Sequence, residues 1–371
     1  MLRALLAALW LGIALPFMGR VFPETTATSV AGIKSHAPQS TLSKPRISAS
    51  GKGQGMNDHD HENDGVNRRH ALECMIWAGT GVLWTVASGV PQSLGLLGDA
   101  AAAEAAATGF TFLQISDSHV GFDKPANPHA LDTLKEAMDH VSALKTKPAF
   151  ILHTGDITHL SKPAEFDNAE KLISSAGLPV HYVPGEHDIV DEGTGKAYLE
   201  RYGKNTKGSG WYSFDQNGVH FIGLVNVASL KAGGLGFLGA DQLEWLEDDV
   251  NALKVSTPIV VFAHIPLWSI YPAWGWGTDD AAVALGYLKR FGSVTVLNGH
   301  IHQLMQKVEG NVTFHTARST AFPQPAPGAA PSPGPMLVPA EKLRSVLGIT
   351  SVTYSQGKEA LAITDTALDS K

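Results

Sequence analysis

The sequence predicts an α/β fold built on parallel strands, and three stretches carry that prediction. Residues 110–115 alternate in polarity and are rich in β-forming types, and 149–154 is an apolar run with the length of a buried strand. Between them, 130–145 places leucine, methionine and valine at helical spacing on one face. A strand, a helix and a strand in this order form a βαβ unit with parallel strands and a right-handed crossover.

The chain continues this alternation after the first unit. Further elements are expected in this order: a helix over 165–176, a strand over 179–183, a strand over 219–225, a helix over 241–253, and strands over 258–263, 293–298 and 312–314. Residues 322–339 are rich in proline, alanine and glycine and are expected to be extended and weakly structured. A short helix over 341–347 and a terminal hairpin of 349–354 and 360–364 complete the chain.

Five of the predicted strands end on residues that can bind metal ions. The strand ends are, in chain order, Asp117-x-His119, Gly155-Asp156, Gly185-Glu186-His187-Asp188, His264 and Gly299-His300-x-His302. The carboxyl ends of such strands are where open α/β sheets hold their ligands. One buried histidine is more often a packed core residue, but five such strand ends in order are not expected by chance. Carboxylate and imidazole together suit zinc, manganese or iron, so the sequence predicts a metal site.

Composition narrows the class of protein. The 371 residues are 44% hydrophobic, which is enough for one large domain or two modest ones with a core. The formal charge of −7 gives no support for a nucleic-acid-binding surface, which usually leaves a basic footprint. The single cysteine, Cys74, excludes a disulfide framework and a cysteine-based zinc site.

The N-terminal region contains two candidate export signals. Residues 2–19 hold one arginine and an apolar run, and the polar segment after them is expected to be disordered. A second start-like residue follows at Met56, so residues 1–55 are interpreted as a non-native extension or a disordered segment. Residues 56–108 are interpreted as the export signal, ending in an alanine-rich cleavage region.

The second signal resembles a twin-arginine (Tat) export signal. Arg68, Arg69 and Leu72 match that pattern, whereas Ala71 stands where phenylalanine is common. The alternative is a single membrane-anchoring helix, although the apolar run over 74–90 only reaches the lower limit for a span and glycines interrupt it. The Tat resemblance implies that the Tat machinery is a partner, that the mature protein has no stable membrane span, and that it is periplasmic or secreted.

The ordered strand ends resemble the calcineurin-like metallophosphoesterases, in particular the bacterial class III cyclic-nucleotide phosphodiesterases. The resemblance runs from about 110 to 317, through the blocks Asp-x-His, Gly-Asp, Gly-x-His-Asp, His and Gly-His-x-His. It implies a four-layer α/β/β/α sandwich. We expect a catalytic domain over 109–320, with 321–371 packing on it as a proline-rich segment followed by a helix and a hairpin.

The resemblance also implies two divalent or trivalent metal ions of iron, manganese or zinc. One ion would be held by Asp117, His119, Asp156 and His302, and the second by Asp156, Glu186, His264 and His300. Glu186 departs from the family pattern, which has asparagine there. His187 would lie beside the leaving group, and Asp188 is expected to orient it.

Three further residues are candidates for binding substrate, each with a structural alternative. His159 lines the pocket or is a surface-loop histidine. Trp268, on an aromatic loop after His264, forms a pocket wall or part of a hydrophobic plug. Arg318 reaches a substrate phosphate or forms a surface ion pair, which is the more frequent case.

These features lead to a hypothesis with two rivals. The protein is expected to be an exported dinuclear-metal enzyme that hydrolyses small phosphodiesters, including cyclic nucleotides, by attack of a metal-bridging hydroxide. The first rival is an acid-phosphatase-like phosphomonoesterase. The second is a metal- or phosphate-binding protein whose turnover is weak or lost because of Glu186.

Overall fold

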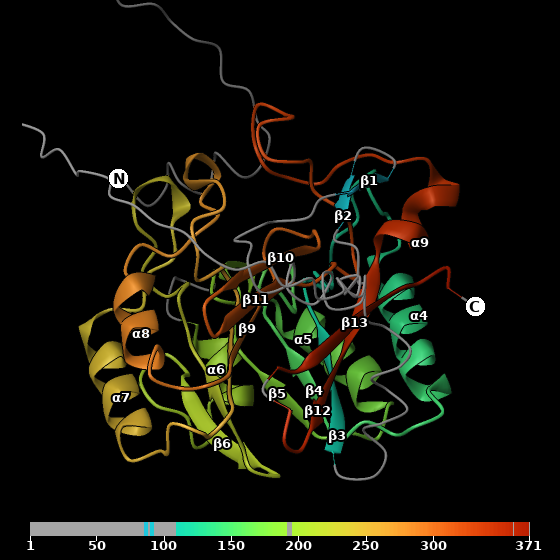
Figure 1. The fold of residues 1–371 in the computed structure, drawn as a ribbon. Coiled ribbons are helices and arrows are strands. Elements are labelled where there is room, and N and C mark those ends of the chain that lie inside the picture. The colour runs from blue at the N-terminus through green and yellow to red at the C-terminus, as the bar shows by residue number, and fades with distance from the viewer. Residues whose placement is uncertain (1–84, 88–89, 93–108, 191–194, 359, 371) are drawn as a thin grey trace, which may run out of the picture. The chain divides into compact units, whose positions relative to one another are not determined.

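The computed structural model describes residues 85–87, 90–92, 109–190, 195–358 and 360–370, all within the unit Ala78–Lys371 (Figure 1). Within 56–108, only strands β1 (Thr85–Ala87) and β2 (Val90–Gln92) are described, and they form an antiparallel pair. Outside the described residues lie the expected extension 1–55 and the alanine-rich cleavage region. The two candidate export signals also lie there, apart from the residues of β1 and β2. Among the described residues, no helix combines the length and the hydropathy that a membrane span requires.

The first sheet has five strands in the order β13-β12-β3-β4-β5. Its strands are β3 (Gly109–Ile115), β4 (Ile151–His153), β5 (Val180–Tyr182), β12 (Gly348–Ser355) and β13 (Ala362–Ala367). β3, β4 and β5 are parallel, as the βαβ pattern predicts, and β12 joins β3 antiparallel. The C-terminal hairpin therefore extends this sheet and does not merely pack on the domain.

The second sheet has six strands in the order β10-β11-β9-β8-β7-β6. Its strands are β6 (Tyr212–Gln216), β7 (Val219–Gly223), β8 (Ile259–Ala263), β9 (Val294–Asn298), β10 (Met305–Glu309) and β11 (Val312–Thr316). β7, β8, β9 and β11 are parallel, while β6 and β10 pair antiparallel at the two edges. The edge strands β6 and β10 were not expected from the sequence.

The two sheets pack face to face on an aromatic core. Phe112 and Phe150 of the first sheet contact Phe221 of the second with ring centroids 5.2 Å apart in both pairs. All three side chains are buried, together with Leu152, Val260 and Leu297. Inward-facing residues of both sheets thus form a single apolar layer.

Helices cover the outer faces of the sheets. α4 (Ala130–Ala143) and α5 (Pro163–Ser174) bury their apolar stripes against the first sheet, and α7 (Ala240–Asn251) and α8 (Ala281–Leu288) do so against the second. Figure 1 shows α7 and α8 beside β6–β11 and α4 on the opposite flank. The expected four-layer α/β/β/α sandwich is confirmed.

Shorter elements lie in the connections. They are α6 (Lys196–Tyr202), α9 (Leu343–Val346) and the 3₁₀ turns η1 (Glu186–Asp188), η2 (Ala232–Gly234), η3 (Pro272–Trp274) and η4 (Ala340–Lys342). The expected helix near 341–347 corresponds to η4 and α9. Neither α6 nor α8 was expected from the sequence.

This topology brings the predicted strand ends together. The register pairs Ile115 of β3 with His153 of β4, and Ala263 of β8 with Asn298 of β9, so the carboxyl ends align within each sheet. The two sheets are joined at this edge by the side chain of Gln114, whose Nε2 donates to the Asn298 carbonyl at 3.1 Å. The loops after these strands therefore meet at one place.

Candidate metal centre

The loops that follow the strands are held in an unusual backbone conformation. Asp117, His119, Asp156, His300 and His302 have positive φ angles of 53°, 40°, 52°, 71° and 53°. Non-glycine residues rarely adopt this region, and it costs about 1–3 kcal/mol per residue. Such residues persist where surrounding contacts hold them and concentrate at functional sites. All five are residues that the sequence predicts to be metal ligands.

Two loops with these residues hold each other across the sheets. The backbone N–H of His300 donates to both oxygens of the Asp117 carboxylate, at 3.0 and 3.2 Å. The N–H of His119 donates to the Asp156 carbonyl at 2.9 Å. Strand ends from both sheets are therefore fixed to one another by main-chain donors.

The first group of converging side chains consists of Asp117, His119 and His302. His302 Nε2 lies 3.2 Å from Asp117 Oδ1 and 3.2 Å from His119 Nε2. One ligand atom from each of the three residues lies within 4.8 Å of the others, and all three side chains are buried. This is the donor set of a small, hard or borderline cation.

The second group consists of Glu186, His264 and His300. Glu186 Oε2 lies 3.0 Å from His264 Nε2, and Glu186 Oε1 lies 3.0 Å from His300 Nδ1. Glu186 Oε2, His264 Nε2 and His300 Nδ1 are all buried and have no hydrogen-bond partner. Buried polar atoms without a partner are costly. A metal ion would satisfy them together, so the donor set fits a divalent cation.

Asp156 lies between the two groups. Its Oδ2 is 3.4 Å from His119 Nε2 and also 3.4 Å from His264 Nε2, while its Oδ1 accepts the backbone N–H of His187 at 3.0 Å. The loop geometry is tight here, because a Cβ on Gly185 would lie 2.0 Å from Asp156 Oδ1. Glycine at 185 therefore permits the close approach of the two loops.

The histidines in these groups are oriented by partners on their outer side. His264 Nδ1 donates to the Thr154 carbonyl at 2.7 Å, and His302 Nδ1 donates to the Phe322 carbonyl. Each of these bonds leaves Nε2 facing the cluster, where it would bind a cation in place of a proton. His119 differs, since its Nδ1 lies 3.4 Å from Nδ1 of His159, a side chain.

The charges of the cluster hold the Glu186 and Asp117 carboxylates ionised. Burial raises the pKa of Glu186, but His300 and His264 outweigh burial and hold the pKa well below its ordinary value. For Asp117, burial is likewise outweighed by His302 and His264, which lower its pKa to about 2. In return, Asp156 and Glu186 overcome the effect of burial and raise the pKa of His264 well above its ordinary value. A cation at this position would replace the proton on the imidazole.

His187 and Asp188 are placed in a way that corrects one expectation. The Asp188 carboxylate accepts the backbone N–H groups of Ile157, Thr158 and Gly185 at 3.0, 2.8 and 2.9 Å. His187 Nδ1 donates instead to the carbonyl of His159 at 2.7 Å. Asp188 therefore joins the Gly155-Asp156 and Gly185-Glu186 loops, and a main-chain carbonyl orients His187. Asp188 was expected to orient His187 because the two are adjacent in sequence, but within η1 their side chains point in different directions.

His159, one of the three candidate substrate residues, lies beside the cluster. Its ring stacks on His187, with centroids 4.9 Å apart and planes 16° apart, and meets Phe122 edge-on at 5.2 Å. Burial, followed by the proximity of His187, lowers the pKa of His159 to about 4. The surface-loop alternative for His159 does not describe this half-buried, packed side chain.

The other two candidates point to structural roles. Trp268 packs on Phe314 with centroids 5.1 Å apart, within an aromatic cluster that includes Trp274 and the fully buried Trp276. This arrangement matches the hydrophobic-plug alternative. Arg318 donates to the carbonyl of Ser345 on the C-terminal segment, and burial lowers the pKa of its guanidinium. It is therefore tied to packing between segments.

Sequence reasoning missed Phe322 as a site residue. Its carbonyl accepts from His302, and its ring lies 4.8 Å from His119 and 4.5 Å from His302. Residues 322–339 contain no helix or strand, but the side chains of Phe322 and Gln324 are buried, so the expectation of a weakly structured segment is wrong at its start. No motif marks this contact, which depends on the tertiary fold.

Comparison with known proteins agrees with this architecture. The family model for calcineurin-like phosphoesterases matches residues 110–304. A 3',5'-cyclic-nucleotide phosphodiesterase of Nostoc sp. is 24% identical over 218 residues, covering 56% of this chain and 77% of the relative. A probable cyclic nucleotide phosphodiesterase of Synechococcus sp. is 27% identical over 219 residues, covering 57% of this chain and 82% of the relative.

Two further likenesses are more distant or shorter. A probable glycerophosphodiester phosphodiesterase of Arcobacter nitrofigilis is 26% identical over 167 residues, and the match spans only 56% of its length and 42% of this chain. The solved structure of a dimetal phosphatase from Danio rerio has a TM-score of 0.52 at 13% identity, covering 70% of this chain and 96% of that protein. From the family-model match, which spans more than half of the chain, we conclude that this protein is a hydrolase of phosphoric esters and belongs to the calcineurin-like phosphoesterase family.

Proposed function

We propose that this protein is a two-metal phosphodiesterase. The observation that carries the proposal is the position of Asp156 Oδ2, 3.4 Å from a histidine nitrogen of each three-residue group. One carboxylate oxygen between two such groups is the arrangement expected of a ligand shared by two ions. The first ion would be held by Asp117, His119, Asp156 and His302, and the second by Asp156, Glu186, His264 and His300.

Two divalent or trivalent ions of iron, manganese or zinc would supply charge neutralisation for the phosphoryl group and a nucleophile from water at neutral pH. The chain's own contribution is the geometry around them. His187 is held by the His159 carbonyl and by packing on the His159 ring, beside the cluster. Asp156 and Glu186 raise the pKa of His187 against the effect of burial. This favours a proton on His187, which it would donate to the leaving oxygen.

We favour diesters over monoesters as substrates. The support is that the relatives from Nostoc, Synechococcus and Arcobacter are all named phosphodiesterases, the first two for cyclic nucleotides. The alternative is a phosphomonoesterase, favoured by the likeness in fold to a dimetal phosphatase. The second rival, a binding protein without turnover, rests on Glu186 alone.

Hydrolysis assays separate these three functions. Bis(p-nitrophenyl) phosphate, p-nitrophenyl phosphate and cyclic AMP would be supplied to the protein loaded with Mn²⁺, Zn²⁺, Fe²⁺ or Co²⁺. The proposal predicts a higher kcat/KM for the diesters with at least one metal, and loss of that activity in Asp156→Ala. A preference for the monoester would favour the phosphatase. No hydrolysis with any of the metals, together with retained metal binding, would favour the binding protein.

We also propose that the enzyme is exported through the twin-arginine route to the periplasm or beyond. The support is the Arg68-Arg69 pair ahead of the apolar run and the alanine-rich stretch that follows. In a chain that starts at Met56, replacing both arginines with lysine should leave the protein in the cytoplasm, as judged by fractionation. Export that is unchanged in the Lys-Lys variant would contradict the Tat route and favour the signal at residues 2–19.

A further inference from the structure

His119 is the member of the first group whose outer partner is a side chain. Its Nε2 faces the cluster, 3.4 Å from Asp156 Oδ2 and 3.2 Å from His302 Nε2, so Nδ1 carries the ring proton when Nε2 binds a metal. The atom opposite that proton is Nδ1 of His159, at 3.4 Å. The contact has the direction of a long hydrogen bond from His119 to His159.

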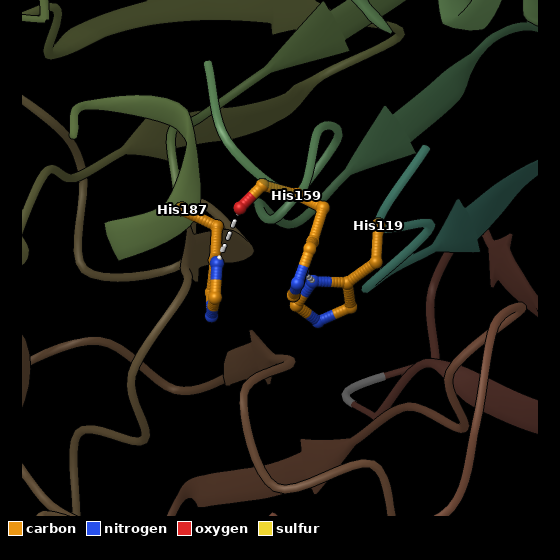
Figure 2. A group of neighbouring side chains, drawn as sticks. All are labelled: His119, His159 and His187. Carbon is orange, nitrogen blue, oxygen red and sulfur yellow. Dashed lines mark hydrogen bonds between the residues drawn. The ribbon is translucent and has the colours of Figure 1, made fainter. Parts of the chain in front are cut away.

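His159 also contacts the histidine beside the substrate position. Its main-chain carbonyl accepts Nδ1–H of His187 at 2.7 Å, and the two imidazole rings lie nearly parallel. Figure 2 shows His159 between His119 and His187, with its ring directed at His119 and its carbonyl at His187. A single residue thus contacts both a metal-site histidine and the proposed proton donor.

The position of His159 is well fixed. Its backbone N–H donates to the Val120 carbonyl at 3.0 Å, and Val120 pairs with Thr158 in a parallel bridge. Phe122 meets the His159 ring edge-on, and the stack with His187 closes the other side. The ring is therefore oriented from two sides, which is what an outer partner of a metal ligand requires.

We propose that His159 is a positioning residue that fixes His119 through its ring and His187 through its carbonyl. The proposal rests on the proposed function, because it concerns a ligand of the first metal. The same role cannot be tested by a side-chain substitution at the partners of His264 and His302. His264 and His302 are oriented by main-chain carbonyls, which substitution leaves in place, whereas the partner of His119 can be removed by changing one side chain.

His159→Phe is the most direct variant. Phenylalanine keeps a ring that can stack on His187 and contact Phe122, and the carbonyl at 159 remains, but the acceptor for His119 is lost. His159→Asn restores an acceptor at a similar reach without the ring. His181→Phe is a matched control, because His181 on β5 also stacks on an aromatic ring, Phe214, with centroids 3.8 Å apart.

The measurement is a titration of each metal-free variant of the full chain with Co²⁺ alone. The visible absorption of bound Co²⁺ and elemental analysis report the sites. His159→Phe should weaken one of the two binding steps by roughly 10–100-fold, with a changed Co²⁺ spectrum. The other step should be unchanged. His159→Asn should recover most of the affinity, and His181→Phe should match the original protein.

Thermal melts establish that each variant is folded before it is titrated. If His159→Phe does not fold, the comparison of His159→Asn with His159→Ala carries the same test, with the weaker step expected in alanine alone. Two Co²⁺ steps with unaltered affinities and spectra in both His159→Phe and His159→Ala would overturn the proposal while leaving the two-metal function intact. Absence of two binding steps in the original protein would instead contradict the proposed function.

Discussion

Histidines of the second sheet meet carboxylates at both ends of its parallel strands. Glu186 meets His264 and His300 at the carboxyl end, and His220 meets Asp215 and Asp249 at the amino end, where the register pairs His220 with Ile259 at the start of β8. The distances are similar: 2.8 and 2.9 Å in the His220 cluster, and 3.0 Å for both contacts of Glu186. Both clusters combine imidazole with carboxylate, one with two histidines and one glutamate, the other with one histidine and two aspartates.

The difference lies in how the ring nitrogens are satisfied. His220 Nδ1 bonds Asp215 Oδ1 and His220 Nε2 bonds Asp249 Oδ2, so both nitrogens have partners. His264 Nε2 and His300 Nδ1 are buried without a hydrogen bond. The His220 cluster is therefore complete as a hydrogen-bonded support between β7, β6 and α7, whereas the Glu186 cluster has buried ring nitrogens that a cation would satisfy. Between these two clusters, the unsatisfied ring nitrogens mark the one that fits a cation.

The largest effect is expected at the shared carboxylate. Asp156→Ala should remove both metal ions and lower kcat/KM by more than about 10³-fold, equivalent to about 4 kcal/mol of transition-state stabilisation. His119→Ala should be milder, because it affects one group only. Elemental analysis and diester hydrolysis report the two effects. His220→Asn is the matched control in the satisfied cluster and should retain both metals; two ions per chain in Asp156→Ala would show that Asp156 is not shared.

A smaller effect is expected at Glu186, the departure from the family pattern. In the proposed centre, glutamate would give the second ion a full negative charge, so Glu186→Asn should weaken binding of that ion by at least about tenfold. With less negative charge, a coordinated water becomes more acidic, and the acid limb of the pH–rate profile should move to lower pH. Melting curves should show that the variant stays folded. Unchanged metal affinity and pH profile, or activity raised equally at every pH, would mean that Glu186 is not a ligand.

The smallest effect is expected in the His220 cluster, where a substitution should lower the free energy of unfolding but leave activity unchanged. Burial lowers the pKa of His220, but the hydrogen bonds to Asp249 and Asp215 outweigh burial and raise it. The charged histidine therefore stabilises the fold fully below the unfolded-state pKa of about 6.5, and this contribution is lost as the pH rises through the higher folded-state pKa. His220→Asn should cost about 1–3 kcal/mol at pH 5.5 and less at pH 9.

Denaturant unfolding at the two pH values measures this difference. A cost that grows with pH would contradict the assignment of a charged His220 between two carboxylates. Metal content and kcat/KM should be unchanged in the same variant, because the cluster lies at the far end of the strands from the metal centre.

The sequence predicted those parts of the fold that have a clear local pattern of apolar and polar residues. β3, α4 and β4 have strong periodicity, and Asp117, Asp156 and His264 each follow a strand, so the ends of parallel strands placed them together. The missed elements lack such patterns. β10 is an edge strand with two of its five residues exposed, and α8 is apolar on most of its surface, so neither shows a clear alternation or stripe.

Within the site, the sequence could not predict the direction in which each side chain points. The order of the motifs could not show that Asp188 faces backbone N–H groups, because its partners come from the loop after β4. Nor could it show that the Phe322 carbonyl accepts from His302, a contact across 20 residues that include β10 and β11. The Trp268 loop was ambiguous because an aromatic cluster in a loop has the same composition whether it lines a pocket or packs as a plug.

X-ray diffraction recorded at the absorption edge of the bound metal tests the central claim most directly. Crystals of the protein grown with Mn²⁺ or Zn²⁺ should show two anomalous peaks about 3.5–4 Å apart. Asp156 Oδ2 should lie between the peaks, one ion next to Asp117, His119 and His302, and the other next to Glu186, His264 and His300. A single peak, or two peaks that do not share Asp156, would contradict a centre built on one bridging carboxylate.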